Sequence, residues 1–153
     1  MRIAVQEATF DIGEESNRFA AGLAARGANA GAIVTFTGVV RGSDTGDMTA
    51  MEIEHYPGMT ERAIREIADQ AKARWSLADV LVIHRHGRLE PGEQIMMVAT
   101  ASRHRVHAFE AAEFLMDYLK SRAPFWKKEF CRDGSGAWVE AKDSDEEALD
   151  RWT

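Results

Sequence analysis

Two strand-like segments that follow each other with only a turn between them constrain the fold of this chain most. Residues 79–87 (DVLVIHRHG) and 94–102 (QIMMVATAS) are apolar and rich in β-branched side chains, as strands are. The turn at Pro91-Gly92 separates them, and no helix-length segment lies between them. In a doubly wound α/β sheet, a helix connects successive strands. We therefore predict an α+β fold, in which strand pairs are mixed with single helices.

The rest of the chain has the same mixed order. It contains no repeat, linker or low-complexity tract, so we expect one domain spanning residues 1–153. Apolar alternation and turn residues predict further strands at 2–7, 31–40, 50–56 and 137–142. The strand at 31–40 (GAIVTFTGVV) is expected to be largely buried. Helical periodicity predicts helices at 13–26, 60–75 and 102–121.

The ends of the last two helices have recognisable signals. Ser102 is expected to be the N-cap of the third helix, and Pro124 ends that helix. Residues 125–128 are then expected to lie in a loop. Ser144 and Glu147 have the spacing of a capping box, which predicts a terminal helix.

Charge and apolar pattern exclude several classes of function. A formal net charge of -6 over 153 residues argues against general nucleic-acid binding, which needs a basic surface. No segment approaches the ~20 apolar residues that span a bilayer, and the N-terminal residues do not resemble a signal peptide. The single cysteine, Cys131, allows no internal disulfide and suits a reducing compartment. We therefore expect a cytoplasmic protein that binds neither nucleic acid nor membrane.

Residues 119–130 (LKSRAPFWKKEF) form a basic cluster on this acidic chain, with Lys120, Arg122, Lys127 and Lys128 close together. The helix dipole favours cations at a helix C-terminus, which explains the first two without any ligand. A lysine beside apolar rings, however, loses solvation, and this lowers its pKa toward that of a catalytic amine. Local cations on an acidic protein also suit a small anion or an acidic partner. The residues alone leave both interpretations open.

The start of the third predicted helix carries a second group of cations. Arg103, His104 and Arg105 lie where the partial positive charge of a helix N-terminus disfavours them, at a cost of ~0.3–1 kcal/mol each. A bound anion would reverse that cost, whereas solvated or paired cations would need no ligand. Arg41, followed by Gly42, could bind a phosphate or carboxylate at a strand end, or simply belong to a turn.

Two histidine pairs raise the possibility of a metal site. His84 and His86 lie on one predicted strand, and His104 and His107 lie on one predicted helix. No paired cysteines and no ligand-like spacing of acids accompany them, so surface or hydrogen-bonded histidines are favoured and we expect no metal. Cys131 has no identifiable partner base and is not expected to be a reactive thiol.

Six blocks of the sequence carry a family resemblance: GAIVTFTGVVR, EHYPGMTE, IHRHGRLEPGE, TASRHR, AFEAAEFLMDYLKSRAPFWKKE and WVEAKDSDEEAL. In order and spacing they resemble the large (catalytic) subunit family of molybdopterin synthases. The resemblance covers residues 31–152, and the blocks MDYLKSRAPFWKKE and SRHR are the most specific.

This resemblance implies a sulfurtransferase of molybdenum cofactor biosynthesis. Such an enzyme converts cyclic pyranopterin monophosphate (precursor Z) to molybdopterin. Sulfur comes from the C-terminal Gly-Gly thiocarboxylate of a small ubiquitin-like subunit. The resemblance also implies a heterotetramer built on a dimer of large subunits, and an α/β hammerhead fold with an additional small antiparallel sheet. It implies no cofactor for this step.

Carried onto this sequence, the family's substrate-binding positions include many of the cations described above. They fall on Val39, Val40, Arg41, His104, Arg105, Lys120, Lys127, Lys128 and Glu129. Phe36 falls near the pocket, and Lys142 corresponds to a basic position that reaches a neighbouring subunit's site.

The role that we expect for Lys120 is acid–base catalysis and binding of the donor carboxylate, with Lys127 assisting. Two positions depart from the family pattern. Val39 stands where some relatives have Lys, which leaves only its backbone for a substrate contact, and Gly42 replaces a common Asn.

A non-catalytic module of the same fold, which binds a phosphate or docks a partner, is the alternative function. Its sequence would differ little from that of the enzyme. The presence of cations at positions 41, 104, 105, 120 and 127 favours the enzyme.

Overall fold

The computed structural model describes residues 1–153 and contains two four-stranded sheets, four α-helices and one short 3-10 helix. The helices are α1 (Ile12–Ala25), α2 (Met59–Trp75), α3 (Arg105–Ser121), α4 (Asp143–Ala148) and the 3-10 helix η1 (Leu149–Trp152). The strands are β1 (Arg2–Gln6), β2 (Ala32–Val39), β3 (Met48–His55), β4 (Asp79–Arg85), β5 (Gly87–Leu89), β6 (Gln94–Ser102), β7 (Phe125–Cys131) and β8 (Gly136–Trp138). The predicted α+β fold is confirmed.

The first sheet has the strand order β1-β4-β6-β2. β4 and β6 are antiparallel neighbours, with Val82 opposite Val98, although the connection between them contains β5, which pairs with β3 in the second sheet. β1 is parallel to β4, whereas β2 is antiparallel to β6. All seven residues of β4 are buried because this strand has a neighbour on each side and helices on both faces.

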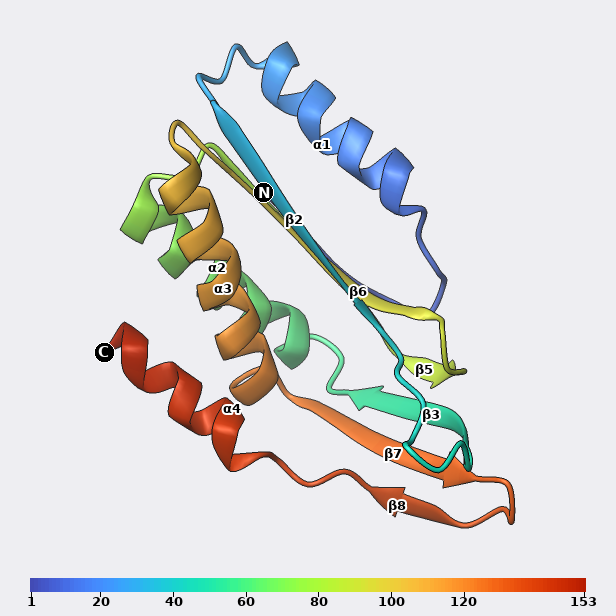
Figure 1. Cartoon of the computed structure of the whole chain (residues 1–153). Coiled ribbons are helices and arrows are strands. Elements are labelled where there is room, and N and C mark those ends of the chain that lie inside the picture. The colour runs from blue at the N-terminus through green and yellow to red at the C-terminus, as the bar shows by residue number, and fades with distance from the viewer.

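Alternation along β4 divides the apolar core into two parts. Leu81 and Ile83 point toward α1, where they join a cluster with Phe19 and other side chains. Val80 and Val82 point the other way, into a larger cluster with residues of α2 and α3. Figure 1 shows the sheet nearly edge-on, with α1 on one side and α2 and α3 on the other. The first sheet is thus covered on both faces.

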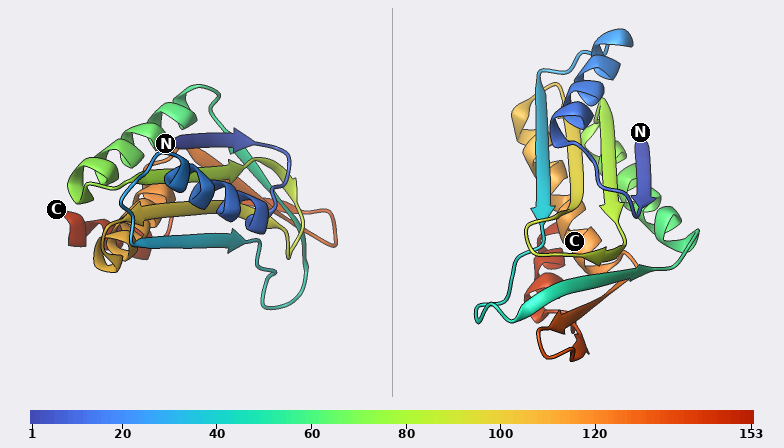
Figure 2. Two further views of the ribbon diagram at one scale, coloured as in Figure 1. Left: turned by 90° about the horizontal axis from the view of Figure 1, so that it is seen from above. Right: turned by 90° about the vertical axis from the view of Figure 1, so that its right-hand side faces the viewer.

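The second sheet is antiparallel and has the order β5-β3-β7-β8. It lies across one end of the first sheet, as the right-hand view of Figure 2 shows. In the β3–β7 pairing, His55 lies opposite Phe125 and Ile53 lies opposite Lys127. Because α3 leads almost directly into β7, the end of that helix and the start of this strand are held together.

The prediction that residues 31–40 form a largely buried strand is wrong in its burial. β2 is the last strand of the first sheet and has β6 as its only neighbour. Ile33, Phe36 and Val39 are 42%, 44% and 52% exposed. Composition indicated a strand correctly, but its place at the edge depends on pairing with a segment about sixty residues away.

Two expectations about the third helix also need correction. Residues 125–128 do not form a loop, because they pair with β3 as the start of β7. Ser102 is not the N-cap, since β6 continues through it and the helix begins at Arg105 with His104 as its N-cap. The buried Ser102 hydroxyl instead accepts a weak hydrogen bond from the His104 N–H, at 3.4 Å.

The C-terminal elements differ from the expected ones in their limits. The strand predicted at 137–142 is confined to Gly136–Trp138. The terminal helix begins one residue before Ser144, so the capping box is wrong: Lys142 is the N-cap, and no side chain caps the helix. The Lys142 carbonyl accepts from the N–H groups of Asp145 and Glu146, at 3.0 and 3.4 Å, and this starts the helix early.

Candidate functional site

Lys120 and Lys127 are brought together by the junction between α3 and β7. Lys120 lies in the last turn of α3, and Lys127 is the third residue of β7. Burial, and next to it the positive charge of Lys120, lowers the pKa of Lys127 to about 8. A lysine that is partly neutral near physiological pH can take up and release protons.

The C-terminal segment completes the surroundings of the lysine pair. The charge of Asp145 raises the pKa of Lys127, whereas the charge of Lys142 lowers it. The Ser121 hydroxyl donates to the Asp145 carbonyl at 2.9 Å, and Arg122 forms an ion pair with Glu146 at 2.7 Å. These contacts hold α4 alongside the end of α3 (Figure 1). Lys142, expected to reach a neighbouring subunit's site, thus lies near the lysine pair of its own chain.

Residues 127–129 (KKE) do not all lie on the same face of β7, because side chains alternate along a strand. Lys127 and Glu129 share one face of β7, and Lys128 lies on the other. The Lys128 ammonium is 5.4 Å from the ring centres of both Phe130 and Trp138, a cation–π arrangement. Within one chain, Lys128 therefore does not share the environment of the lysine pair.

The cations at the start of α3 lie far from the lysine pair. Fifteen residues separate Arg105 from Lys120, and a rise of 1.5 Å per residue places them about 22 Å apart along the helix. The first turn of α3 contains no acid, and His104 makes no side-chain cap. Gly31 allows a close approach here, since a Cβ at that position would lie 2.4 Å from the Arg103 carbonyl oxygen. One chain does not bring these cations to Lys120 and Lys127.

The predicted site positions 39–41 lie at the end of β2 and directly after it. The register of β2 shifts between Gly38 and Val39, and the side chain of Val39 points partly into solvent. Val40 is buried; its N–H donates to the Glu93 carbonyl and its carbonyl accepts from the Gly92 N–H, both at 2.8 Å. Arg41 makes no ion pair within the chain. Its guanidinium is thus free for a ligand.

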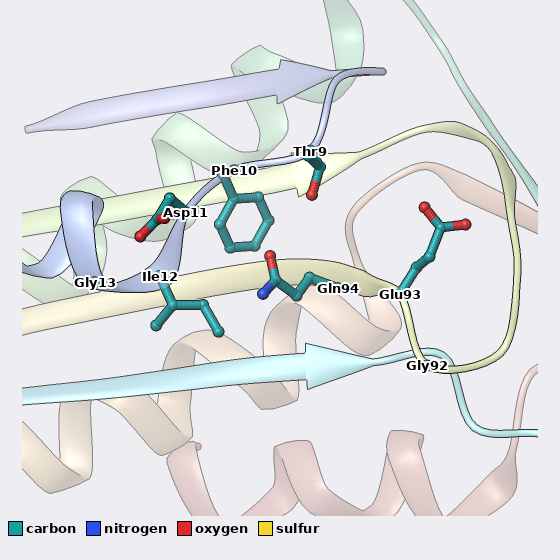
Figure 3. A pocket seen from close by; sticks show the side chains of 8 residues that line it. All are labelled: Thr9, Phe10, Asp11, Ile12, Gly13, Gly92, Glu93 and Gln94. Atoms are coloured by element: carbon teal, nitrogen blue, oxygen red, sulfur yellow. The ribbon is translucent and has the colours of Figure 1, made fainter.

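A surface hollow that was not predicted lies elsewhere. It has a volume of about 620 Å³ and is lined by Thr9, Phe10, Asp11, Ile12, Gly13, Gly92, Glu93 and Gln94 (Figure 3). Its charged lining residues are acidic, and the buried Gln94 Oε1 atom has no hydrogen-bond partner. An acidic lining repels anions, so this hollow does not suit the anionic reactants that the resemblance implies.

His84 and His86, the histidine pair predicted on one strand, lie in different surroundings. No group of three or more His, Cys, Asp or Glu side chains is arranged to hold a metal ion. His86 packs against His55, with ring centres 4.1 Å apart, whereas His84 is buried and stacks on Phe125.

None of the helices combines the length and apolar composition that crossing a membrane requires.

The sequence model of the family described as MoaE protein matches residues 5–122. The chain belongs to the MoaE protein family. This confirms the family that the six sequence blocks indicate. A relative from Cereibacter sphaeroides, named molybdopterin synthase catalytic subunit, is 64% identical over 152 residues, which are 99% of this chain and the whole of that protein.

Solved structures of MoaE proteins have the same fold. A structure from Burkholderia ambifaria, described as a molybdopterin biosynthesis MoaE protein, is 49% identical and has a TM-score of 0.79. It covers 99% of this chain and 98% of its own. A complex of subunits 1 and 2 of molybdopterin-converting factor from Helicobacter pylori matches with a TM-score of 0.74. At 20% identity, over 92% of this chain and 90% of that one, it shows the fold alone.

Proposed function

We propose that this MoaE protein is the catalytic subunit of a molybdopterin synthase. It transfers sulfur from the C-terminal Gly-Gly thiocarboxylate of a small ubiquitin-like subunit to cyclic pyranopterin monophosphate, forming the dithiolene of molybdopterin. Identity of 64% with a full-length relative of that name supports this function. Residues 1–153 act as one catalytic-subunit domain, and the reaction takes place in the cytoplasm.

The lysine pair is the observation that supports the chemistry best. Both reactants are anionic, since the substrate carries a phosphate and the donor carries a thiocarboxylate. Bringing two anions together requires fixed cations, and cations in a partly buried site act more strongly than cations in water. Lys120 and Lys127 provide two cations at one place, of which Lys127 is partly buried and Lys120 is exposed.

The pKa of Lys127 modifies the division of roles expected from the sequence. With a pKa of about 8, the Lys127 amine exchanges protons near neutral pH, so Lys127 is the better acid–base group. Lys120 then supplies the positive charge that binds the donor's terminal carboxylate group. The same charge lowers the pKa of Lys127. Arg41, His104 and Arg105 bind the phosphate and the pterin oxygens.

His104 and Arg105 reach the lysine pair only if more than one chain contributes to a site. The length of α3 separates Arg105 from Lys120 by about 22 Å within one chain. We therefore propose that a homodimer of this chain combines the helix start of one copy with the lysine pair of the other. The dimer forms the centre of a heterotetramer with two small subunits.

A reconstituted conversion followed by mass spectrometry tests this function. The reaction contains this protein, the thiocarboxylated small subunit and cyclic pyranopterin monophosphate. We expect the native protein to form the dithiolene product. Lys120→Ala and Lys127→Ala should each reduce the rate at least ~100-fold, because each removes a charge or a proton carrier from the reacting centre.

Circular dichroism of both variants is the control for folding. Full activity of either folded variant would remove that lysine from the mechanism. A native protein that binds the small subunit but forms no product, beside a working reference synthase, would instead indicate the non-catalytic docking module.

A further inference from the structure

His84 is a buried titratable residue that the proposed mechanism does not use. It lies near the end of β4 and is 5% exposed. Its Nδ1 atom is 2.8 Å from the Arg85 carbonyl oxygen. Because a carbonyl oxygen only accepts, Nδ1 carries the proton and donates it, and Nε2 of the neutral ring is unprotonated.

The ring of His84 forms a direct contact between the two sheets. It stacks on the ring of Phe125, with centres 3.7 Å apart and planes inclined by 19°. Phe125 is the first residue of β7 and lies two residues before Lys127. Since residues two apart on a strand share a face, Phe125 and Lys127 lie on the same side of β7. The stack therefore fixes the part of β7 from which Lys127 projects.

The electrostatic environment requires this ring to stay neutral. Burial, together with the charges of Lys127 and Lys120, lowers the pKa of His84 to about 3, although the hydrogen bond to the Arg85 carbonyl acts in the opposite direction. A protonated ring here would add a third cation beside the two lysines. The neutral ring instead contributes uncharged surface, stacked on Phe125, beside the partly buried Lys127.

Charged groups from several elements act on Lys127. Lys120 from α3 and Lys142, which precedes α4, disfavour its protonated form, whereas Asp145 from α4 favours that form. His84 from β4 is close enough to interact with both lysines but carries no charge. Of these groups, His84 is thus suited to act through packing.

We propose that His84 is a positioning residue, whose ring holds Phe125 and thereby keeps the Lys127 amine partly buried beside Lys120. This role rests on the function proposed above. It predicts that loss of the ring admits water and makes the Lys127 amine an ordinary exposed lysine. A purely structural role of His84 predicts lower stability without any specific change at Lys127.

Trace labelling of amines with acetic anhydride between pH 6 and 11, read by peptide mass spectrometry, separates these two roles. The reactivity of Lys127 reports its fraction of neutral amine and requires neither substrate nor small subunit. The proteins are the native chain, His84→Ala, His84→Phe and the control Ile83→Ala. Ile83 is the adjacent residue on β4, is also buried, and faces the α1 cluster instead of Phe125.

We expect half-reaction of Lys127 near pH 8 in the native protein and in Ile83→Ala. In His84→Ala the midpoint should rise by about one pH unit or more, because added water stabilises the ammonium. His84→Phe keeps a flat ring against Phe125 and should return the midpoint toward that of the native chain. Conversion assays on the same variants should show the same order in the pH dependence of kcat.

Equal midpoints in the native chain and a folded His84→Ala would overturn the proposal. A midpoint shifted as strongly by Ile83→Ala would also overturn it, because general loosening would then explain the effect. If the labelling result holds while the native protein converts no substrate, the proposed function fails and the positioning of Lys127 stands.

Discussion

Lys127 is held in an environment that suits an uncharged side chain better than a charged one. Its pKa of about 8 lies below the ordinary 10.5, so at neutral pH the folded protein holds a proton that burial disfavours. The unfolded chain binds this proton more tightly between pH 8 and 10.5, and stability therefore rises with pH across that window. Below pH 8 the full cost is present.

Lys127→Met should therefore stabilise the protein while abolishing sulfur transfer. Methionine has a similar length and no charge, so the expected gain at pH 7 is on the order of 2 kcal/mol in free energy of unfolding. Urea unfolding at pH 7 measures it, with Lys72→Met on α2 as a control that should change stability little. Equal or lower stability of Lys127→Met would contradict the assigned cost.

His84 gives a second residue-scale prediction, at acid pH. Its pKa in the folded protein is about 3, below the ordinary 6.5, so the unfolded state binds the additional proton as pH falls below 6.5. Stability should decrease by about 1.4 kcal/mol per pH unit from this residue alone. In His84→Phe this decrease in stability should be absent between pH 6.5 and 5. His86 is present in both proteins, so it does not account for a difference between their curves. Parallel stability curves of the two proteins would contradict it.

Single residues also show what the sequence can and cannot reveal. The basic residues Lys120 and Lys127 could be selected from charge and spacing, because their unusual feature is chemical. The exclusion of Lys128 from their surroundings could not, since a loop was expected where alternation along β7 applies. The importance of His84 depends on its stack with Phe125, a contact between segments forty residues apart.

At the scale of elements, the α3–β7 junction is anchored by Thr60 of α2. This residue is fully buried; its hydroxyl donates to the Pro124 carbonyl at 3.1 Å and accepts from the Tyr56 N–H at 2.9 Å. One side chain thus connects the end of β3, the start of α2 and the segment between the two lysines. No sequence signal distinguishes this threonine from an ordinary helix-start residue.

Thr60→Val removes both hydrogen bonds without a large change in volume. We expect a loss of about 2 kcal/mol in stability, because two partly buried backbone groups lose their partner. The conversion rate should also fall, since the junction that sets the lysine separation is loosened. Thr60→Ser retains the hydroxyl and should preserve most of both properties. Thermal unfolding and the conversion assay provide the two readouts, and a Val variant with native values would show that the anchor is unimportant.

Elements with strong local patterns were predictable, and those that depend on distant pairing were less so. The helical periodicity of 60–75 and the apolar, β-branched segments on either side of Pro91-Gly92 specify α2, β4 and β6 from local sequence. β7 was missed because Pro124 ends the helix and favours a loop after it locally, whereas pairing with β3 makes these residues a strand. The edge position of β2 likewise follows from sheet order, which no local pattern contains.

At the scale of the whole molecule, α3 divides the predicted site into two parts at its opposite ends. A shared site between two copies predicts complementation between two inactive variants. Arg105→Ala and Lys120→Ala should each be nearly inactive alone. In a mixed dimer one of the two sites keeps both residues, so random pairing should restore about a quarter of native activity. Co-expression followed by the conversion assay measures this recovery.

Each variant expressed alone, which forms only dimers of identical chains, is the matched control. No recovery, in mixtures shown by mass spectrometry to contain mixed dimers, would mean that each chain forms its site alone. That result would require Arg105 to act without approaching the lysine pair, and its assignment to substrate binding would be withdrawn.

The fixed length of α3 has a consequence for how such a chain can change during evolution. Inserting one residue between Arg105 and Lys120 would lengthen the helix by about 1.5 Å and rotate Lys120 by about 100° relative to the helix start. Substitutions on the outer face of the helix leave this geometry intact, whereas a single insertion or deletion changes both the spacing and the direction. Active descendants of this chain should therefore differ in the types of many residues between Arg105 and Lys120, but never in the number of residues between them.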